Sequence, residues 1–393
     1  MWIERTAQAV LARMARSFPV VMVTGPRQVG KTSLLRKMFA RCDYLSLDLP
    51  ANAEAAKSAP AQLLADYATP LIVDEIQYAP ELMRYLKHLL NENMTPGQYL
   101  LTGSQVFPLM QGISESLAGR CGILNLNTLS FAEIAAHQPE TSEIDYIFTG
   151  GYPDLHVRAE RDLWYPSYVA TYIERDVRNV LNITDLQDFN RFLRVCALRN
   201  GQIINFTDMA RDTGIAPNTA KKWTGVLQTS GLIALLEPYF GNRTKRLIKS
   251  PKLYFLDPGL AVFLAGFKNL EALIQSPMLG ACWESFVVGE IWRHFAFKGQ
   301  SPNFYHWRTT SGAEVDIVIE HSGNKMLAIE CKLKEQPSAA DTKNLQALTA
   351  AEGAKVETRF IVCRTPANYQ LPDGTWVANI KGVMKHLHDL DQI

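Results

Sequence analysis

A glycine-rich segment near the N-terminus carries the residue types that bind phosphate groups. It fits the pattern G-x-x-x-x-G-K-S/T and reads Gly25-Pro26-Arg27-Gln28-Val29-Gly30-Lys31-Thr32-Ser33. The glycines let the backbone turn its N–H groups toward phosphate oxygens, the lysine supplies positive charge to the β and γ phosphates, and the threonine hydroxyl can bind Mg²⁺. The segment therefore predicts a P-loop that binds ATP and magnesium, with these nine residues as the nucleotide contacts.

Two adjacent carboxylates follow the next buried strand candidate. The apolar segment 70–73 leads directly into Asp74 and Glu75. Such a pair resembles a Walker B segment, in which Asp74 would hold the metal ion through water and Glu75 would polarise the attacking water. Hydrophobic strands that end in Asp-Glu also occur as plain structure, so the P-loop upstream is what favours the catalytic interpretation.

Further side chains could complete ATP hydrolysis. The strand candidate 98–104 ends in hydroxyl groups, so Ser104 or Thr102 could serve as a polar sensor beside the γ phosphate. A positive charge that stabilises the transition state could come from Arg120 or Arg175. A salt bridge on a helix surface is the plainer alternative for either arginine. An arginine that acts on a neighbouring copy would require a homo-oligomer.

Apolar periodicity predicts the elements that must position these residues. Residues 19–24 form a short apolar strand candidate directly before the P-loop, and the residues after the loop keep apolar side chains at helical spacing. Strand, loop and helix in this order are the context that a P-loop requires. In the segment 161–181, apolar residues recur at intervals of three and four. This spacing predicts a long helix that leads out of the ATPase core.

A helix-turn-helix pattern occupies the middle of the chain. Two short helices are predicted within 208–223, followed by strand candidates at 232–236 and 252–255. The segment between these strands is basic, so the region reads as a winged helix whose wing could contact DNA phosphates. Winged helices also serve as lids and protein-contact modules, so both uses stay open. The candidate DNA contacts are Lys221, Lys222, Arg243, Lys245, Arg246 and Lys249.

Acidic residues and a lysine gather on two predicted strands near the C-terminus. Segments 312–319 and 325–333 look like paired strands, and alternation puts Glu330 and Lys332 on one face, within reach of Asp316. These residues, with Glu284 on a predicted helix as a further acid, could hold Mg²⁺ and activate water against a phosphodiester, as in restriction-endonuclease-like folds. The alternative is a solvent-facing hairpin with ordinary charged residues.

The composition fits a folded chain of two or three domains. Its 393 residues exceed one ordinary core, and 47% hydrophobic with 20% charged residues excludes a disordered or fibrous class. Lys and Arg number 40 against 39 Asp and Glu, so attraction for nucleic acid must come from a local patch. Six scattered cysteines, no signal-like segment and no membrane-length apolar run predict a cytoplasmic protein without structural zinc.

The motifs together resemble those of a large prokaryotic family of predicted AAA+ superfamily ATPases. The resemblance runs nearly end to end, and the order of the motifs makes it specific. Beyond the P-loop it rests on Leu101-Thr102-Gly103-Ser104, Gly150-Gly151-Tyr152-Pro153, Tyr172-x-x-Arg175-Asp176-Val177, Lys249-Ser250-Pro251-Lys252, and Trp307-Arg308-Thr309 leading into Glu314-Val315-Asp316.

The resemblance implies an α/β fold in three parts. These are a P-loop AAA+ ATPase domain over 1–150, a helical and winged-helix domain over 151–270, and an α/β restriction-endonuclease-like domain over 271–393. It also implies an ATPase linked to DNA or to a protein partner. The leading hypothesis is a nucleotide-driven switch. An ATP-dependent DNA nuclease and a non-catalytic nucleotide-gated binding protein are the alternatives.

Overall fold

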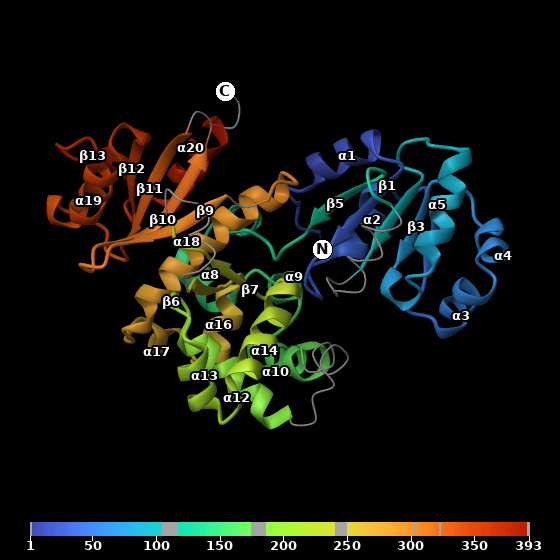
Figure 1. Ribbon diagram of the computed structural model, residues 1–393, viewed down its shortest axis with the longest axis horizontal. Helices are drawn as coiled ribbons and strands as arrows, with labels where there is room; N and C mark the ends of the chain where they lie inside the picture. Colours follow the sequence, from blue (N-terminus) through green and yellow to red (C-terminus); the bar gives the residue numbers. More distant parts are fainter. Residues whose placement is uncertain are drawn as a thin grey trace.

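The computed structural model describes residues 2–103, 117–173, 186–239, 250–301, 303–321 and 324–390. Within these ranges the chain forms a five-stranded, a three-stranded and a six-stranded sheet. Figure 1 shows the five-stranded sheet on the right, the six-stranded sheet at the upper left and the helices of the middle region below. The mixed α/β architecture predicted from the sequence is confirmed.

The five-stranded sheet is parallel throughout, in the order β2-β3-β4-β1-β5. Every residue of β1, β3 and β4 is buried, as expected of strands covered by helices on both faces. Since β5 lies on the other side of β1 from β2, β3 and β4, the strand order reverses at β1, and ligands bind at such points in open α/β sheets. The strands are β1 Val20–Thr24, β2 Asp43–Ser46, β3 Leu71–Asp74, β4 Tyr99–Thr102 and β5 Cys121–Asn125.

Helices cover both faces of this sheet. Apolar side chains of α1 and α2 pack against one face, and those of α5 pack against the other. Each of these helices carries an apolar stripe on one side, which is the pattern expected of a surface helix on a core. The helices here are α1 Gln8–Ser17, α2 Lys31–Met38, α3 Pro50–Ser58, α4 Pro60–Ala65, α5 Leu82–Glu92 and the 3₁₀ turn Ile76–Tyr78.

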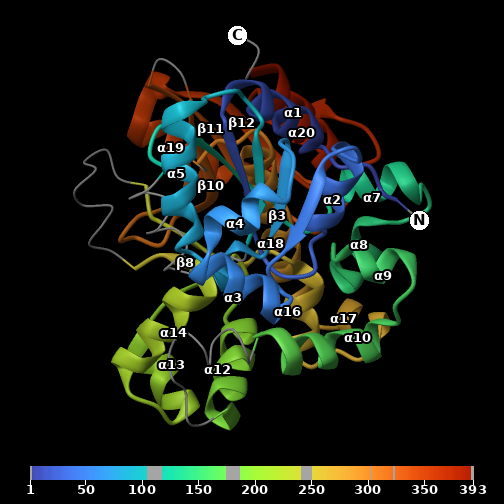
Figure 2. The ribbon, with the colours of Figure 1, turned by 90° about the vertical axis from the view of Figure 1, so that its right-hand side faces the viewer.

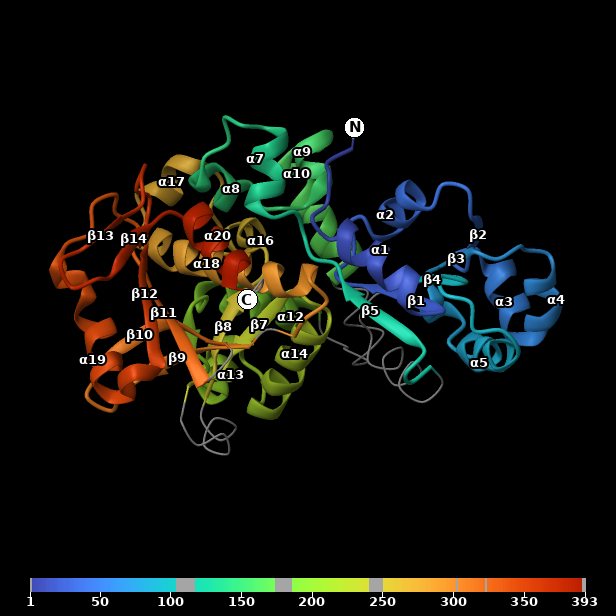
Figure 3. The same cartoon turned by 90° about the horizontal axis from the view of Figure 1, so that it is seen from above.

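Two helices after β5 pack toward the C-terminal half. α7 (Phe131–His137) and α8 (Glu143–Thr149) each begin with a capping box. The rings of Phe131 and Tyr146 contact Phe286 edge-on, with centroids 5.8 and 5.5 Å away. Phe286 belongs to α18 (Met278–Phe297), so α7 and α8 share a core with a helix of the last third of the chain. Figure 3 shows α7 to α10 between the two large sheets.

The middle region combines helices with a small antiparallel sheet of order β6-β8-β7. α13 ends at Gly214 in the left-handed region, and Pro217 opens α14. The predicted strands at 232–236 and 252–255 are confirmed, while the winged-helix interpretation stays a prediction. The elements are α9 Pro153–Val157, α10 Arg161–Tyr168, α12 Leu186–Leu198, β6 Gln202–Ile203, α13 Phe206–Thr213, α14 Pro217–Thr229, β7 Ile233–Leu236, β8 Lys252–Phe255, α16 Pro258–Leu264 and α17 Leu270–Ile274. Figure 2 shows α12, α13 and α14 at the lower end of the molecule.

The predicted long helix over 161–181 is only partly α-helical. Its first part is α10, and the chain continues as a π-helical turn over Val169–Ile173. The π turn changes the spacing of the backbone hydrogen bonds. The apolar residues at intervals of three and four therefore do not correspond to one uniform α-helix. Residues 174–181 of the prediction lie outside the described residues.

The C-terminal sheet has the order β13-β14-β12-β11-β10-β9. α18 and α20 pack on one face and α19 on the other. β10 and β11 are antiparallel, with Ile317 opposite Ile329, so the predicted pairing of these strands is confirmed. The elements are β9 Phe304–Arg308, β10 Glu314–His321, β11 Lys325–Cys331, α19 Lys343–Glu352, β12 Val356–Val362, β13 Tyr369–Gln370, β14 Trp376–Ala378, α20 Ile380–Leu390 and the 3₁₀ turns Ala339–Thr342 and Gly353–Lys355.

Helix length and polarity leave no membrane span in the described part of the chain. None of its helices is both long enough and apolar enough to cross a bilayer. The 20-residue α18 has sufficient length, but it carries the charged residues Glu284, Glu290 and Arg293.

Candidate nucleotide-binding site

The P-loop connects β1 to α2, and its glycines occupy positions that other residues would not fit. Gly25 has a φ of 138°, and a Cβ there would lie 2.0 Å from the carbonyl oxygen of Leu126. Gly30 has a φ of 88° and precedes the first residue of α2. Both conformations favour glycine. The strand, loop and helix predicted around the motif are therefore present, and the backbone itself requires its two glycines.

Lys31 begins α2 and points back into the loop. Lys31 is 5% exposed, and its Nζ donates to the carbonyl oxygens of Gly25 at 3.1 Å and Pro26 at 2.8 Å. The ammonium thus lies inside the curve of the loop, where the P-loop pattern places phosphate groups.

Asp74 receives hydrogen bonds from several hydroxyl groups. Its Oδ1 accepts from Thr32 Oγ1 at 2.6 Å and from Thr102 Oγ1, and its Oδ2 accepts from the Tyr44 hydroxyl at 2.8 Å. Burial, followed by the hydrogen bond to Asp74, raises the pKa of Tyr44 to about 12, so the phenol stays protonated and keeps donating. The structure therefore brings together the predicted metal residues, Thr32 and Asp74, and adds Tyr44 from β2.

Glu75 has a left-handed backbone, with a φ of 58°. Its N–H donates to Thr102 Oγ1 at 3.0 Å, and the Gln77 amide donates to its carboxylate. Positive φ is uncommon outside glycine and concentrates at functional sites. This turn directs Glu75 into the cavity that Lys31 and Asp74 also line.

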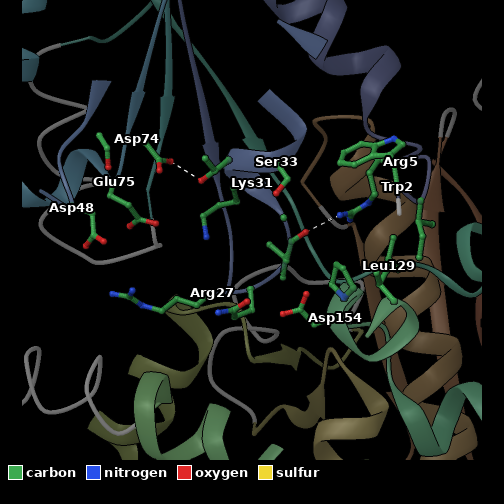
Figure 4. Close-up of a pocket in the computed structure, with 18 of the residues that line it drawn as sticks. Trp2, Arg5, Arg27, Lys31, Ser33, Asp48, Asp74, Glu75, Leu129 and Asp154 are labelled. Carbon is green, nitrogen blue, oxygen red and sulfur yellow. Dashed lines mark hydrogen bonds between the residues drawn. The ribbon is translucent and has the colours of Figure 1, made fainter. Parts of the chain in front are cut away.

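The cavity around these residues has a volume of about 790 Å³. Figure 4 shows Asp74 and Glu75 on one side of Lys31, and Trp2 and Leu129 on the other. A ligand with a charged end and a flat apolar end would match this division. Ile3, Pro153 and Val157 add apolar atoms to the lining of the cavity, to which the charged Arg5, Asp154 and Arg158 also belong.

Arg5 is a fully buried cation at the edge of this cavity. It donates to the carbonyl oxygens of Val29 at 2.8 Å and Asn127 at 2.6 Å, and its Nε lies 3.5 Å from Glu133 Oε2. Burial lowers the pKa of Arg5, and the Glu133 carboxylate opposes that shift. Arg5 therefore holds the P-loop backbone at Val29.

Only some of the remaining residues predicted for hydrolysis lie within the described part of the chain. Ser104 and Arg175 lie outside the described residues. Thr102, the other sensor candidate, contacts both Asp74 and Glu75. Arg120 donates to Asn91 Oδ1 at 2.7 Å and does not line the cavity. To stabilise the transition state of hydrolysis, Arg120 would therefore have to act on the nucleotide of another copy of the chain. That role stays a prediction.

The predicted acidic cluster in the C-terminal region contains an ammonium. Lys332 Nζ donates to Glu330 Oε1 at 2.8 Å, so these two residues share a face as predicted. Asp316 and Glu284 lie 3.9 and 3.0 Å from the Nζ atom of Lys252 on β8. Within the described ranges no group of three or more His, Cys, Asp or Glu side chains is arranged to hold a metal ion. The metal role of these acids stays a prediction.

Burial changes the ionisation of this cluster. It raises the pKa of Asp316 well above its usual range, and the neighbouring Glu284 and Glu330 carboxylates add to the shift. Burial and the Lys252 ammonium lower the pKa of His306 to about 4. The cluster is therefore a crowded, poorly solvated set of ionisable groups, in which burial favours the neutral forms of Asp316 and His306.

The candidate DNA contacts are divided between two segments. Lys221 and Lys222 are exposed on α14, the second helix of the predicted helix-turn-helix. The four cations of the predicted wing, Arg243, Lys245, Arg246 and Lys249, lie outside the described residues.

The residues that we did not predict are Trp2, Arg5, Tyr44 and Lys252. Trp2 and Arg5 lie shortly before the strand that leads into the P-loop. An aromatic residue and a cation so close to the motif are a sequence signal by which they could be predicted as part of the nucleotide site. Tyr44 sits on β2 beside β3, in the register that pairs Ser46 with Asp74. That register is a product of the folded sheet, so no local pattern indicates it.

Three family models match the chain in succession. A model described as an AAA domain matches residues 17–135. Two models described as domains of unknown function, DUF8612 and DUF4143, match residues 140–271 and 279–383. The AAA match covers the P-loop and the whole parallel sheet. The N-terminal part of the chain is therefore a nucleotide-binding P-loop domain of the AAA+ type.

Two solved structures align with much of the chain at low identity. The Walker-type ATPase PABY2304 of Pyrococcus abyssi aligns over 67% of this chain and 96% of its own, at 15% identity and a TM-score of 0.45. The AMPPCP-bound DnaA from Aquifex aeolicus aligns over 56% of this chain and 85% of its own, at 15% identity and a TM-score of 0.30.

Two mycobacterial proteins are similar to most of the chain. The uncharacterized proteins Rv2008c of Mycobacterium tuberculosis and Mb2031c of Mycobacterium bovis are each 32% identical to it over 340 residues. The aligned part is 85% of this chain and 75% of each relative. The chain therefore belongs to the family of these two mycobacterial proteins.

Proposed function

We propose that the chain hydrolyses ATP and uses the nucleotide state of its P-loop to change the conformation of its C-terminal half. The observation that carries this proposal is a continuous set of buried polar contacts. It begins at the P-loop carbonyl of Val29, passes through Arg5 and α7, and reaches α18, the helix that packs on the C-terminal sheet.

The cavity supports a specific division of roles in hydrolysis. The P-loop N–H groups and Lys31 bind the phosphates, and the apolar side at Trp2 receives the base. Glu75 takes a proton from a water whose oxygen attacks the γ phosphorus, while the bond from that phosphorus to the ADP oxygen breaks. The adjoining oxygens of Thr32 and Asp74 suit Mg²⁺, which would neutralise charge on the phosphates.

The contacts from the P-loop to α18 are short and buried. Arg5 donates to the Val29 carbonyl at 2.8 Å and pairs with Glu133 at 3.5 Å. Glu133 completes the capping box at the start of α7, where the Phe131 N–H donates to Glu290 Oε1 at 3.1 Å. Because each buried charge in this path is paired, moving one member leaves another unpaired, which is costly. A shift of the P-loop is therefore expected to reach α18.

The same set of buried contacts also extends to the middle region of the chain. Arg293 lies on α18 one turn beyond Glu290, with 2.7 Å between the two charged groups. Its guanidinium also donates to the Leu256 carbonyl at 2.7 Å, directly after β8. Glu290 and Arg293 are 3% and 1% exposed, so solvent does not screen the pair. Movement of α18 would therefore displace the backbone at the end of β8.

Arg5→Lys is expected to uncouple α18 from the nucleotide. Lysine keeps the charge but cannot hold two carbonyl groups and Glu133 with one planar fork. In the parent protein, ATP is expected to change the amide hydrogen exchange of residues 278–297 by roughly 5- to 150-fold, the range that a coupling free energy of about 1 to 3 kcal/mol produces. In the variant this nucleotide-dependent difference is expected to disappear.

The matched control for this experiment is Arg161→Lys. Arg161 is also largely buried and donates to the carbonyls of Phe148 and Phe267, but it does not touch the P-loop. It should leave the nucleotide effect on α18 unchanged. The switch proposal fails if ATP binds to the parent protein and leaves the exchange of α18 unaltered.

DNA is the partner that we propose for this switch, on the basis of the exposed Lys221 and Lys222. Each lysine that binds a DNA phosphate should contribute about 0.9 to the slope of log K against log salt concentration. Lys221→Ala/Lys222→Ala is therefore expected to reduce the slope by about 2 if both lysines bind phosphates. The measurement is fluorescence anisotropy of labelled duplex over a salt series, with Lys57→Ala/Lys87→Ala as a control at exposed lysines elsewhere. A parent protein that does not bind DNA at low salt would make a protein partner the better proposal.

A further inference from the structure

A cavity outside the nucleotide site lies between three helices of the middle region. It has a volume of about 760 Å³ and is formed by α10 with the π-helical turn after it, by α12, and by the end of α16 with the residues that follow. Figure 1 and Figure 2 show α10, α12 and α16 together in the lower half of the molecule. The described residues that line this α12 cavity include none of those around the nucleotide cavity, so it is a separate candidate site.

Local geometry builds two walls of the α12 cavity. Arg194 and Leu198 are four residues apart on α12, so they lie on the same side of that helix. After α16 the chain turns at Gly266, whose φ of 95° is in the left-handed region that favours glycine. Phe267 and Lys268 follow this turn and line the cavity. One wall is therefore a helix face, and another is a turn that depends on a glycine.

Positive charge exceeds negative charge in the lining of the α12 cavity. The described residues around it include three cations, Arg161, Arg194 and Lys268, and one carboxylate, that of Asp162. Arg194 and Lys268 are exposed, and no ion pair holds either of them within the described part of the chain. Cations gathered in one concave surface attract anions. The charges of the lining therefore favour an anionic ligand.

Arg161 is the most buried of these cations, with a side chain that is 10% exposed. Its Nε donates to the Phe148 carbonyl at 2.9 Å and its Nη1 to the Phe267 carbonyl at 3.3 Å, while its buried Nη2 has no hydrogen-bond partner among the described residues. The carboxylate that pairs with it, Asp162 at 3.4 Å, has a side chain that is 75% exposed. Burial lowers the pKa of Arg161. A buried cation with so little compensation is stabilised by an anion beside it.

Apolar side chains supply much of the remaining lining. Val169 and Leu264 are buried, and the rings of Phe263 and Phe267 are half-buried. Leu198 is 53% exposed, so an apolar group in the cavity would remove part of this surface from water. The volume lies within the range of about 300 to 1,000 Å³ that is usual for sites of small molecules. The cavity therefore suits a molecule that has an apolar body as well as a charge.

We propose that the α12 cavity binds a small organic anion with an apolar body. Arg161, Arg194 and Lys268 bind the charged group, and the apolar body packs against Leu198 and Phe263. Because α10, α12 and α16 all contribute to the lining, the bound molecule joins these three helices. The site takes its ligand whether or not the P-loop holds a nucleotide, since the two cavities have different linings.

Octanoate and octanol test the proposal because they have the same chain length and differ in charge. Each is titrated against the parent protein to displace the fluorescent anion anilinonaphthalene sulfonate. We expect octanoate to displace the probe at a concentration about tenfold lower than octanol, since one hydrogen bond to a charged group is worth at least about this factor. The proposal is overturned if octanol is as effective as octanoate, or if the parent binds neither the probe nor octanoate.

Arg194→Gln/Lys268→Gln assigns the preference for octanoate to the α12 cavity. Both residues are exposed, so the variant should fold, and Arg161 is left in place because it also holds two backbone carbonyls. The preference for octanoate over octanol is expected to fall at least about fivefold. The matched control is Arg191→Gln/Lys221→Gln, which removes two exposed cations that do not line the cavity, one of them on α12.

The control variant should keep the preference of the parent protein. An equal preference in Arg194→Gln/Lys268→Gln and in the control would overturn the proposal. Lys31→Ala should bind the probe as the parent does, because Lys31 lines only the nucleotide cavity among the two. Loss of probe binding in Lys31→Ala would place the probe and octanoate in the nucleotide cavity, and the α12 cavity would then not be the anion site.

Discussion

Lys31→Ala is expected to abolish ATP binding at the concentrations that saturate the parent protein. The Lys31 ammonium lies inside the P-loop, 2.8 Å from the Pro26 carbonyl, and is the charge that the loop offers to the phosphates. Hydrogen bonds to charged groups contribute about 1.5 to 3 kcal/mol each, so losing two of them should weaken binding roughly 100-fold or more. Isothermal titration with ATP and Mg²⁺ measures the loss directly.

Lys37→Ala is the matched control for this experiment. Lys37 lies on the same helix, α2, but is exposed and does not line the cavity. It should bind ATP as the parent does. Equal affinity of Lys31→Ala and the parent would mean that the nucleotide binds outside the P-loop, and our assignment of the cavity would be wrong.

Glu75→Gln is expected to bind ATP normally and to lose turnover by about 100- to 10,000-fold, the range attributed to a general acid or base. Glutamine has the shape of glutamate, so the left-handed turn at this residue and the N–H bond to Thr102 are retained. What disappears is the proton acceptor for the attacking water. A single-turnover measurement with radiolabelled ATP separates this loss from any change in product release.

Glu81→Gln provides the comparison for Glu75→Gln. Glu81 is an exposed carboxylate at the start of α5, away from the cavity, and its loss should leave turnover unchanged. Turnover by Glu75→Gln at the parent rate would remove Glu75 from the reaction. A parent protein that binds ATP tightly and never hydrolyses it would instead be a nucleotide-gated binding protein.

The residues of the nucleotide site that the sequence indicates are those whose chemistry is local. The P-loop and its flanking strand and helix occupy neighbouring positions, so spacing alone defines them. Asp74 and Glu75, at the end of β3, are indicated by the apolar segment before them and by the P-loop upstream. These predictions needed no knowledge of which strands pair.

The unpredicted residues depend on contacts between distant segments. Tyr44 reaches Asp74 only because β2 pairs with β3 in one register. Arg5 reaches the Val29 carbonyl because α1 packs beside the sheet. Lys252 enters the acidic cluster because the start of β8 meets α18 and β10. Periodicity and motif spacing describe one element at a time, so contacts of this kind lie beyond them.

α18 carries both Glu284 of the acidic cluster and Glu290 of the path to the P-loop. The six helical steps from Glu284 to Glu290 correspond to about 9 Å along the helix axis, since each residue rises about 1.5 Å. Each added residue would turn one carboxylate by about 100° relative to the other. All five residues between the two carboxylates are buried. This stretch of the chain should therefore tolerate neither insertions nor deletions, and only those substitutions that keep the volume of its side chains.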